Sequence, residues 1–121
     1  MESGSRYVAL WAAQGPLCVL SRFDDPQVSL VVDRQGLMLG SSSSGRSSQL
    51  AAGKGVCEEH AFLMPSANGR WWIKALEKGG DLLADGSWVY SGRIARLRHG
   101  MILRLGCETE LRVDLPDWSG A

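Results

Sequence analysis

Cys57 and His60 are the two residues of this chain whose types and spacing most readily suggest chemistry. They stand three residues apart in the segment CEEHAFL, with Glu58 and Glu59 between them. A thiol close to an imidazole can act as a nucleophile, because the imidazole removes the thiol proton. The sequence places no Asp or Asn specifically to orient the ring, and no oxyanion site can be argued from it. We therefore predict that the protein is not an enzyme, and a small Cys-His hydrolase is the alternative.

The cysteines do not form a pattern that would hold a metal or a disulfide framework. Cys18, Cys57 and Cys107 are odd in number and contain no CxxC spacing. A zinc site would need more ligands at closer spacing, and a small disulfide scaffold would need more cysteines. We expect no cofactor and no metal, and the reducing cytoplasm is the simplest location.

The charges balance overall but are uneven along the chain. Thirteen basic and thirteen acidic residues give a formal net charge of zero, which argues against nucleic acid or an acidic membrane as partner. Four arginines nevertheless stand close together before the next acid, Glu108. They are Arg93, Arg96, Arg98 and Arg104. Solvated strand and turn positions explain them most simply, and a docking patch is the alternative.

Length and turn content indicate one all-β domain. A chain of 121 residues suits a single domain, and fifteen glycines with weak helical periodicity favour many short strands joined by tight turns. Apolar runs predict strands at 7–11, 17–20, 28–32, 37–39, 61–64, 71–73, 82–83, 88–90, 101–105 and 111–113. The dipeptide Asn68-Gly69 suits a type I′ hairpin turn. One short helix is predicted within residues 73–80, ended by Gly79-Gly80. Two packed antiparallel sheets, a β-sandwich, are the expected architecture.

No apolar run reaches the length of a signal peptide or a membrane span, so the chain as given is expected to be soluble. The expected core covers residues 17–114. Residues 115–121 are interpreted as a tail or the start of a linker.

The order of these motifs resembles the forkhead-associated (FHA) domain, a β-sandwich that usually binds phosphothreonine. That family carries Gly-Arg after its early strands, then Ser-x-x-His, then Asn-Gly-Thr. A further Gly turn precedes its last strands. The matching segments here are Gly40-Ser41, Cys57-Glu58-Glu59-His60, Asp85-Gly86-Ser87 and Arg98-His99-Gly100. The resemblance implies a non-catalytic protein-interaction domain. It also implies that His60 braces the recognition loops and that Trp88 occupies a core aromatic position.

The residues that would hold phosphate in that family are altered. Ser41 replaces the arginine and carries no charge, while Cys57 replaces the serine and is a weak donor. Asp85 replaces the asparagine that orients the peptide, and Glu58 and Glu59 add negative charge beside the same loop. We therefore expect a degraded phosphopeptide site. The candidate partner-binding loops carry Ser41, Arg46, Cys57, His60, Asp85 and Ser87.

Two further hypotheses concern what this site binds. Arg46, in the polar loop SSSSGRSS, could replace the missing guanidinium with help from Lys54, which would make the chain a phosphothreonine-binding domain. Alternatively, the Gly-Ser pair and the degraded Ser-x-x-His motif resemble the cytoplasmic domain of type III secretion inner-membrane ring subunits. That resemblance implies other protein subunits as partners, self-association in a ring, and membrane attachment only through a segment outside this chain.

Overall fold

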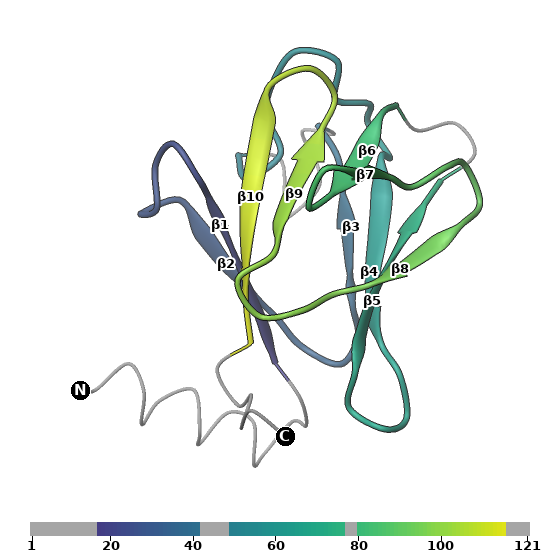
Figure 1. Ribbon diagram of the computed structural model, residues 1–121. Helices are drawn as coiled ribbons and strands as arrows, with labels where there is room; N and C mark the ends of the chain where they lie inside the picture. The colour runs from purple at the N-terminus through teal and green to yellow at the C-terminus, as the bar shows by residue number, and fades with distance from the viewer. Residues whose placement is uncertain (1–16, 42–48, 77–79, 116–121) are drawn as a thin grey trace.

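The protein folds into two antiparallel β-sheets that face one another, as the computed structural model shows (Figure 1). The structure describes residues 17–41, 49–76 and 80–115. Ten strands are present in this part of the chain: β1 (Cys18–Arg22), β2 (Ser29–Val32), β3 (Leu37–Leu39), β4 (Ala61–Pro65), β5 (Trp71–Ala75), β6 (Leu82–Ala84), β7 (Ser87–Trp88), β8 (Ile94–Arg96), β9 (Ile102–Leu105) and β10 (Thr109–Asp114). The predicted all-β sandwich is confirmed.

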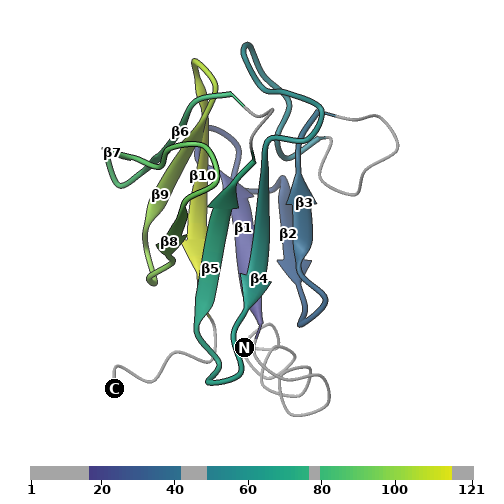
Figure 2. The same ribbon diagram turned by 90° about the vertical axis from the view of Figure 1, so that its right-hand side faces the viewer.

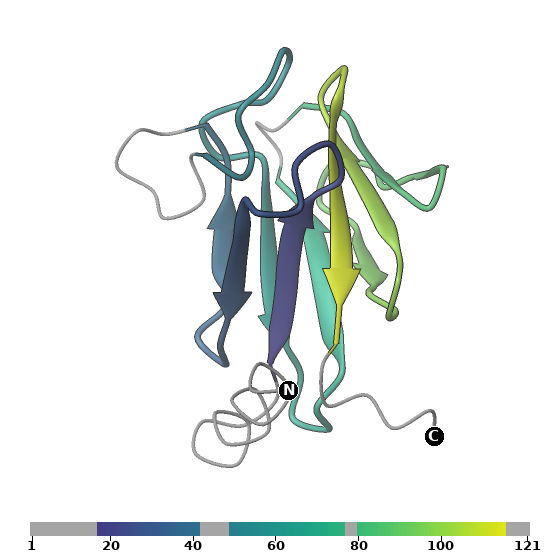
Figure 3. The ribbon, with the colours of Figure 1, turned by 90° about the vertical axis from the view of Figure 1, so that its left-hand side faces the viewer.

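The first and the last strand of the described chain pair with each other. One sheet has the order β2-β1-β10-β9-β6-β7, and the other has the order β3-β4-β5-β8. β1 pairs with β10, with Leu20 opposite Val113. Figure 3 shows β2, β1 and β10 side by side in front of the second sheet, and Figure 2 shows the second sheet from its own side. Each sheet therefore has one face on the core and one face outside.

The core forms where apolar side chains alternate with polar ones along a strand. In β10, Thr109, Leu111 and Val113 are buried while Glu110 and Arg112 are exposed. This period of two is typical of an antiparallel strand with one solvated face. Leu103 and Leu105 of β9 are fully buried in the same core.

Two predictions about local structure are wrong. Residues 73–75, expected to start a helix, are the end of β5, where Ile73 and Ala75 are buried and pair with Leu63 and Ala61. Pairing on both sides, with β4 and β8, overrides the weak helical pattern, whose residues 77–79 lie outside the described chain.

The turn at Asn68-Gly69 is not type I′, because only Gly69 has a positive φ, 83°. Instead, Asp85 and Gly86 both have positive φ, 48° and 82°, between the paired residues Ala84 and Ser87. This two-residue connection has the φ signature of a type I′ hairpin.

Trp88 is the third correction. It was expected in the core, but it lies on the edge strand β7 and is 50% exposed, whereas Trp71 of β5 is 2% exposed and fills the core. Sequence pattern does not distinguish an edge strand from an inner one, since both alternate. The strand predicted at 7–11 lies outside the described residues. In the described segments, no helix is long and apolar enough to cross a membrane.

Candidate partner-binding loops

Three segments meet at the upper end of the sandwich in Figure 1. They are the long β3–β4 connection, the start of β6, and the β9–β10 turn. At two glycines of these segments the backbone passes so close to another backbone group that a Cβ would not fit. A Cβ on Gly40 would lie 1.8 Å from the carbonyl oxygen of Glu58, and one on Gly106 would lie 2.6 Å from the carbonyl carbon of Gly55. Glycine is therefore needed at Gly40, where the last residue of β3 leads into the loops.

His60 is the centre of this loop cluster. Its side chain is fully buried, Nδ1 lies 3.1 Å from the backbone nitrogen of Cys57, and Nε2 lies 2.6 Å from the carbonyl oxygen of Asp81. The same carbonyl also accepts a hydrogen bond from the backbone N–H of Gly106, at 2.9 Å. The imidazole thus joins the β3–β4 connection to the segment that leads into β6.

These contacts fix the tautomer of the ring. The backbone N–H of Cys57 can only donate, so Nδ1 accepts and Nε2 carries the proton that is donated to Asp81. Both ring nitrogens are occupied by backbone groups. The ring is therefore not placed to remove a proton from the thiol of Cys57, which weighs against a Cys-His catalytic pair.

The structure brings Ser41 and Cys57 together beside this brace. The backbone N–H of Ser41 donates to the carbonyl of Cys57 at 2.9 Å, and its hydroxyl donates to the carbonyl of Val56 at 3.2 Å. Ser41 is exposed, as are Glu58 and Glu59. The position of the arginine in the FHA motif that the sequence resembles therefore holds an uncharged hydroxyl whose proton is already donated within the protein.

Arg22 of β1 also supports these loops and was missed in the sequence. Its guanidinium donates to the carbonyl of Ala52 at 2.7 Å and pairs with Asp24 at 2.9 Å. The hydrogen bond and charge of Asp24 raise the pKa of Arg22, and Arg22 lowers the pKa of the Asp24 carboxyl. Arg22 ends β1 and Asp24 lies in the bend that follows, so the available signal was two opposite charges two residues apart just after the predicted strand 17–20.

Gly80 was also misinterpreted. The sequence suggested a helix stop, but a Cβ at Gly80 would lie 2.9 Å from Cε1 of His60 and 2.9 Å from the carbonyl of Gly55. Gly80 therefore allows the chain to pass the imidazole ring. Its role depends on a residue twenty positions earlier, so no local pattern reveals it.

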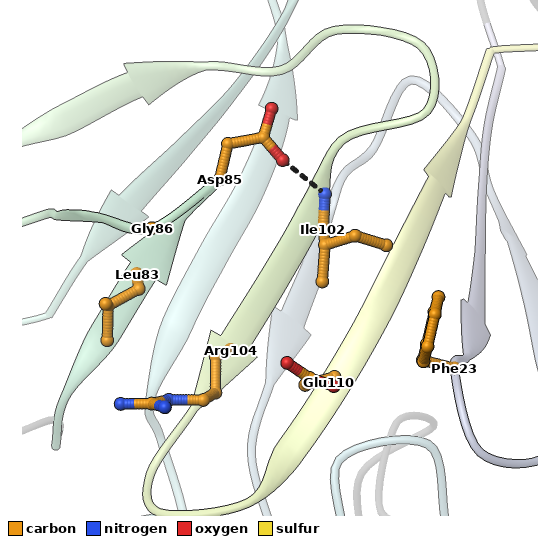
Figure 4. A pocket seen from close by; sticks show the side chains of 7 residues that line it. All are labelled: Phe23, Leu83, Asp85, Gly86, Ile102, Arg104 and Glu110. Carbon is orange, nitrogen blue, oxygen red and sulfur yellow. Dashed lines mark hydrogen bonds between the residues drawn. The ribbon is translucent and has the colours of Figure 1, made fainter.

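No hydrogen bond joins Asp85 or Ser87 to Ser41, Cys57 or His60 in the described part of the chain. Asp85 and Ser87 flank or form the β6–β7 turn, separated from Asp81 by the whole of β6, and three residues of strand span about 10 Å. Figure 4 shows the Asp85 carboxylate directed at the backbone N–H of Ile102, 2.8 Å away. It borders a shallow pocket of about 420 Å³ on the outer face of the sheet, with Phe23, Arg104 and Glu110. The Asp85 carboxylate therefore serves as an acceptor for the backbone of β9.

Arg46 lies outside the described residues, so the structure does not place it. Lys54 is exposed and belongs to the β3–β4 connection, where its carbonyl accepts from the N–H of Cys107 at 2.9 Å. Within the described ranges, no group of three or more His, Cys, Asp or Glu side chains could hold a metal ion.

Solved structures resemble this fold closely. The FHA domain of a hypothetical protein from Arabidopsis thaliana superposes with a TM-score of 0.70 at 17% identity, covering 83% of this chain and 86% of that one. The fold is that of FHA domains. The FHA domain of CT664 from Chlamydia trachomatis gives a TM-score of 0.63 at 14% identity, with coverages of 85% and 99%.

A third FHA domain, that of MEK1, was solved in complex with a phosphothreonine peptide of HOP1. Its TM-score is 0.65 at 13% identity, with coverages of 83% of this chain and 97% of that one. No protein-family model matches the sequence, and a search of curated proteins returns no match either. The likeness to FHA domains therefore concerns the fold, and the site has to be argued from its own residues.

Proposed function

We propose that this chain is a non-catalytic protein-interaction domain that keeps the FHA scaffold and binds its partner without a phosphate group. The observation that carries the proposal is Ser41. It stands where the resemblance expects arginine, and its hydroxyl donates to the carbonyl of Val56. A phosphate dianion needs charged donors, and a neutral hydroxyl supplies only a weak one.

The neighbouring charges strengthen this argument. Glu58 and Glu59 are both exposed on the segment that follows Cys57. Two unit charges 4 Å apart repel by about 1 kcal/mol in water and by about 4 kcal/mol near a protein surface. A doubly charged phosphate near this loop would meet that repulsion without the guanidinium that offsets it in the family.

The more specific part of the proposal follows the resemblance to type III secretion inner-membrane ring subunits. We infer that the domain is the cytoplasmic part of a type III secretion inner-membrane ring subunit, with other subunits as partners and a single domain spanning residues 1–121. In a ring, many weak contacts combine, so each domain can associate weakly and the assembly still holds. Isolated, the domain is then a weakly associating monomer. Light scattering that detects a tight oligomer would contradict the assignment. So would a gene whose product lacks an apolar segment of about 20 residues after residue 121.

A second candidate is a phosphothreonine-binding domain that uses Arg46. It is favoured by the structural neighbours that were solved with phosphopeptides, among them an engineered FHA domain with a Myc phosphopeptide. Fixing the backbone of a residue costs about 1–2 kcal/mol, and each residue of the Ser- and Gly-rich segment around Arg46 that has to be fixed on binding would lower the affinity by that amount.

Titration of a phosphothreonine peptide library against its unphosphorylated counterpart separates these candidates. We expect no preference for the phosphorylated peptides. Micromolar binding that requires the phosphate and is lost in Arg46→Ala would establish the second candidate instead. Arg34→Ala is the matched control, because Arg34 is an exposed arginine in the turn between β2 and β3.

A further inference from the structure

One edge strand of each sheet lies on the same side of the molecule. β7 ends one sheet and β8 ends the other, and a groove of about 340 Å³ lies between them. Figure 1 shows both strands on the same side of the sandwich. Six of the residues that line the groove carry the argument: Trp88, Tyr90, Arg93, Ile94, Arg96 and Arg98.

The outer edge of β8 offers unpaired backbone groups. The N–H of Ala75 donates to the carbonyl of Arg93 and the N–H of Leu97 donates to the carbonyl of Trp71. In an antiparallel pair the backbone groups alternate in direction, so those of Ile94 and Arg96 point away from β5. No other strand of the described chain pairs with β8. An extended segment of another protein could add to this edge.

The side chains beside this edge are apolar and unusually exposed. Trp88 is 50% exposed, Tyr90 69% and Ile94 53%. Trp88 and Tyr90 are two residues apart, and Val89 between them is buried, so both lie on the same face of the chain. Exposed Trp and Tyr that cluster in this way are typical of interface centres, where they supply much of the binding energy.

The connection that carries these aromatics is firmly held. The N–H of Val89 donates to the carbonyl of Leu82 at 2.9 Å, and the N–H of Gly92 donates to the carbonyl of Ala75 at 2.7 Å. These bonds tie the connection to both sheets. A groove that is already ordered loses little conformational entropy when a partner binds.

The charge of the groove selects the partner. Arg93, Arg96 and Arg98 are all exposed, and no Asp or Glu lines the groove in the described part of the chain. None of these guanidinium groups has an ion-pair partner among the described residues. Charged side chains on an edge strand prevent that edge from pairing with the same edge of another copy. The same three cations attract a strand that carries carboxylates.

The geometry points to the edge of β8 as the docking site for an extended acidic segment of a partner protein. The segment would pair with the backbone of Ile94 and Arg96, place alternate apolar side chains against Trp88 and Tyr90, and place carboxylates beside the arginines. The inference rests on the proposed interaction function and adds the surface and the partner chemistry. Nucleic acid is disfavoured, because it cannot pair with a strand edge and the chain has no net positive charge.

The experiment uses a fluorescein-labelled peptide in which Glu alternates with Val. Two controls have the same length: one carries Lys in place of Glu, and one carries N-methyl groups on alternate backbone nitrogens. We expect saturable binding of the Glu peptide only, with amide shifts concentrated at Ile94 and Arg96 in NMR spectra. N-methylation removes the donors that a strand pair needs, while the side chains stay the same.

Protein variants test the same site. Arg96→Glu and Trp88→Ala are each expected to weaken binding at least about tenfold, since charged and aromatic anchors carry most of the affinity in an interface. Arg34→Glu, at an exposed turn between β2 and β3, leaves the affinity unchanged. Circular dichroism verifies that each variant is folded.

Four results would overturn the docking site. The first two are no saturable binding of the Glu peptide and equal binding of either control peptide. The other two are amide shifts confined to Ser41 and Cys57, and an edge of β8 that is occupied by a second copy of the chain or by a single-stranded oligonucleotide. Phosphate-dependent binding at Ser41 would overturn the proposed function and leave the edge result standing. Failure of the Glu peptide while a protein partner still binds elsewhere would overturn the edge alone.

Discussion

Nδ1 of His60 accepts a hydrogen bond from the backbone N–H of Cys57, at 3.1 Å. The imidazole of His60 is thus bonded to the backbone N–H of Cys57 and not to its thiol. The other ring nitrogen donates to the carbonyl of Asp81 at 2.6 Å. The imidazole therefore ties two loops together, and its contribution is to the shape of the loop face.

His60→Ala is expected to lower the free energy of unfolding by about 2–4 kcal/mol, because it leaves the N–H of Cys57 without its acceptor and opens a cavity. Urea denaturation measures the change. His99→Ala serves as the control, since His99 is exposed whereas His60 is fully buried. That variant should differ from the wild type by less than about 1 kcal/mol. Equal losses in both would show that His60 is not a brace.

Gly40→Ala tests how closely the loops pack. A methyl group there would lie 1.8 Å from the carbonyl oxygen of Glu58, which is backbone and cannot turn aside. We expect the free energy of unfolding to fall by more than about 2 kcal/mol, or the NMR amide signals of residues 41–60 to shift. Gly100→Ala meets no atom within 4 Å and has only a positive φ, 83°, to strain it, so its loss should be about 1–2 kcal/mol. A smaller effect at Gly40 than at Gly100 would contradict the packing described.

Asp85 is expected to act in folding and not in phosphate binding. Asp85→Ala should cost about 1–3 kcal/mol, because it removes the acceptor for the N–H of Ile102 and puts alanine at a φ of 48°. Asp85→Asn should cost less than about 0.5 kcal/mol, since asparagine tolerates this φ and keeps a side-chain oxygen. Although Asn is the family's residue, the substitution should not increase the affinity for phosphothreonine peptides. A gain in that affinity would place Asp85 at the peptide site after all.

The stability contributed by the ion pair of Arg22 and Asp24 is expected to depend on pH. Because Arg22 lowers the pKa of the Asp24 carboxyl below its ordinary value of 3.8, the folded state favours the charged form. The stabilisation is present above pH 3.8 and is lost as the pH falls through the lowered folded value. Arg22, whose pKa is raised, stays charged throughout this range.

The wild type should therefore be more stable than Asp24→Asn at neutral pH, by a small amount because the side chain of Asp24 is 69% exposed. The difference should vanish at acid pH. Thermal denaturation at a series of pH values measures it, and Asp33→Asn, a half-buried aspartate in the β2–β3 turn, is the comparison. A difference that is constant with pH would contradict the ion pair.

The sequence by itself determined the sandwich, because alternation such as that of residues 109–113 places one face of each strand in the core wherever the strand lies. Its resemblance to FHA motifs also led us to expect Gly40-Ser41 near the Cys57–His60 segment. The structure brings these residues together around His60.

Other features were decided by tertiary contacts. Ile73 and Ala75 follow β4 and not their own helical pattern, Trp88 is exposed because its strand is the last in its sheet, and Gly80 is needed only because His60 lies beside it. Each of these depends on a neighbour distant in the sequence. Local propensity is worth a few tenths of a kcal/mol per residue, and strand pairing with burial is worth more, so the neighbour decides.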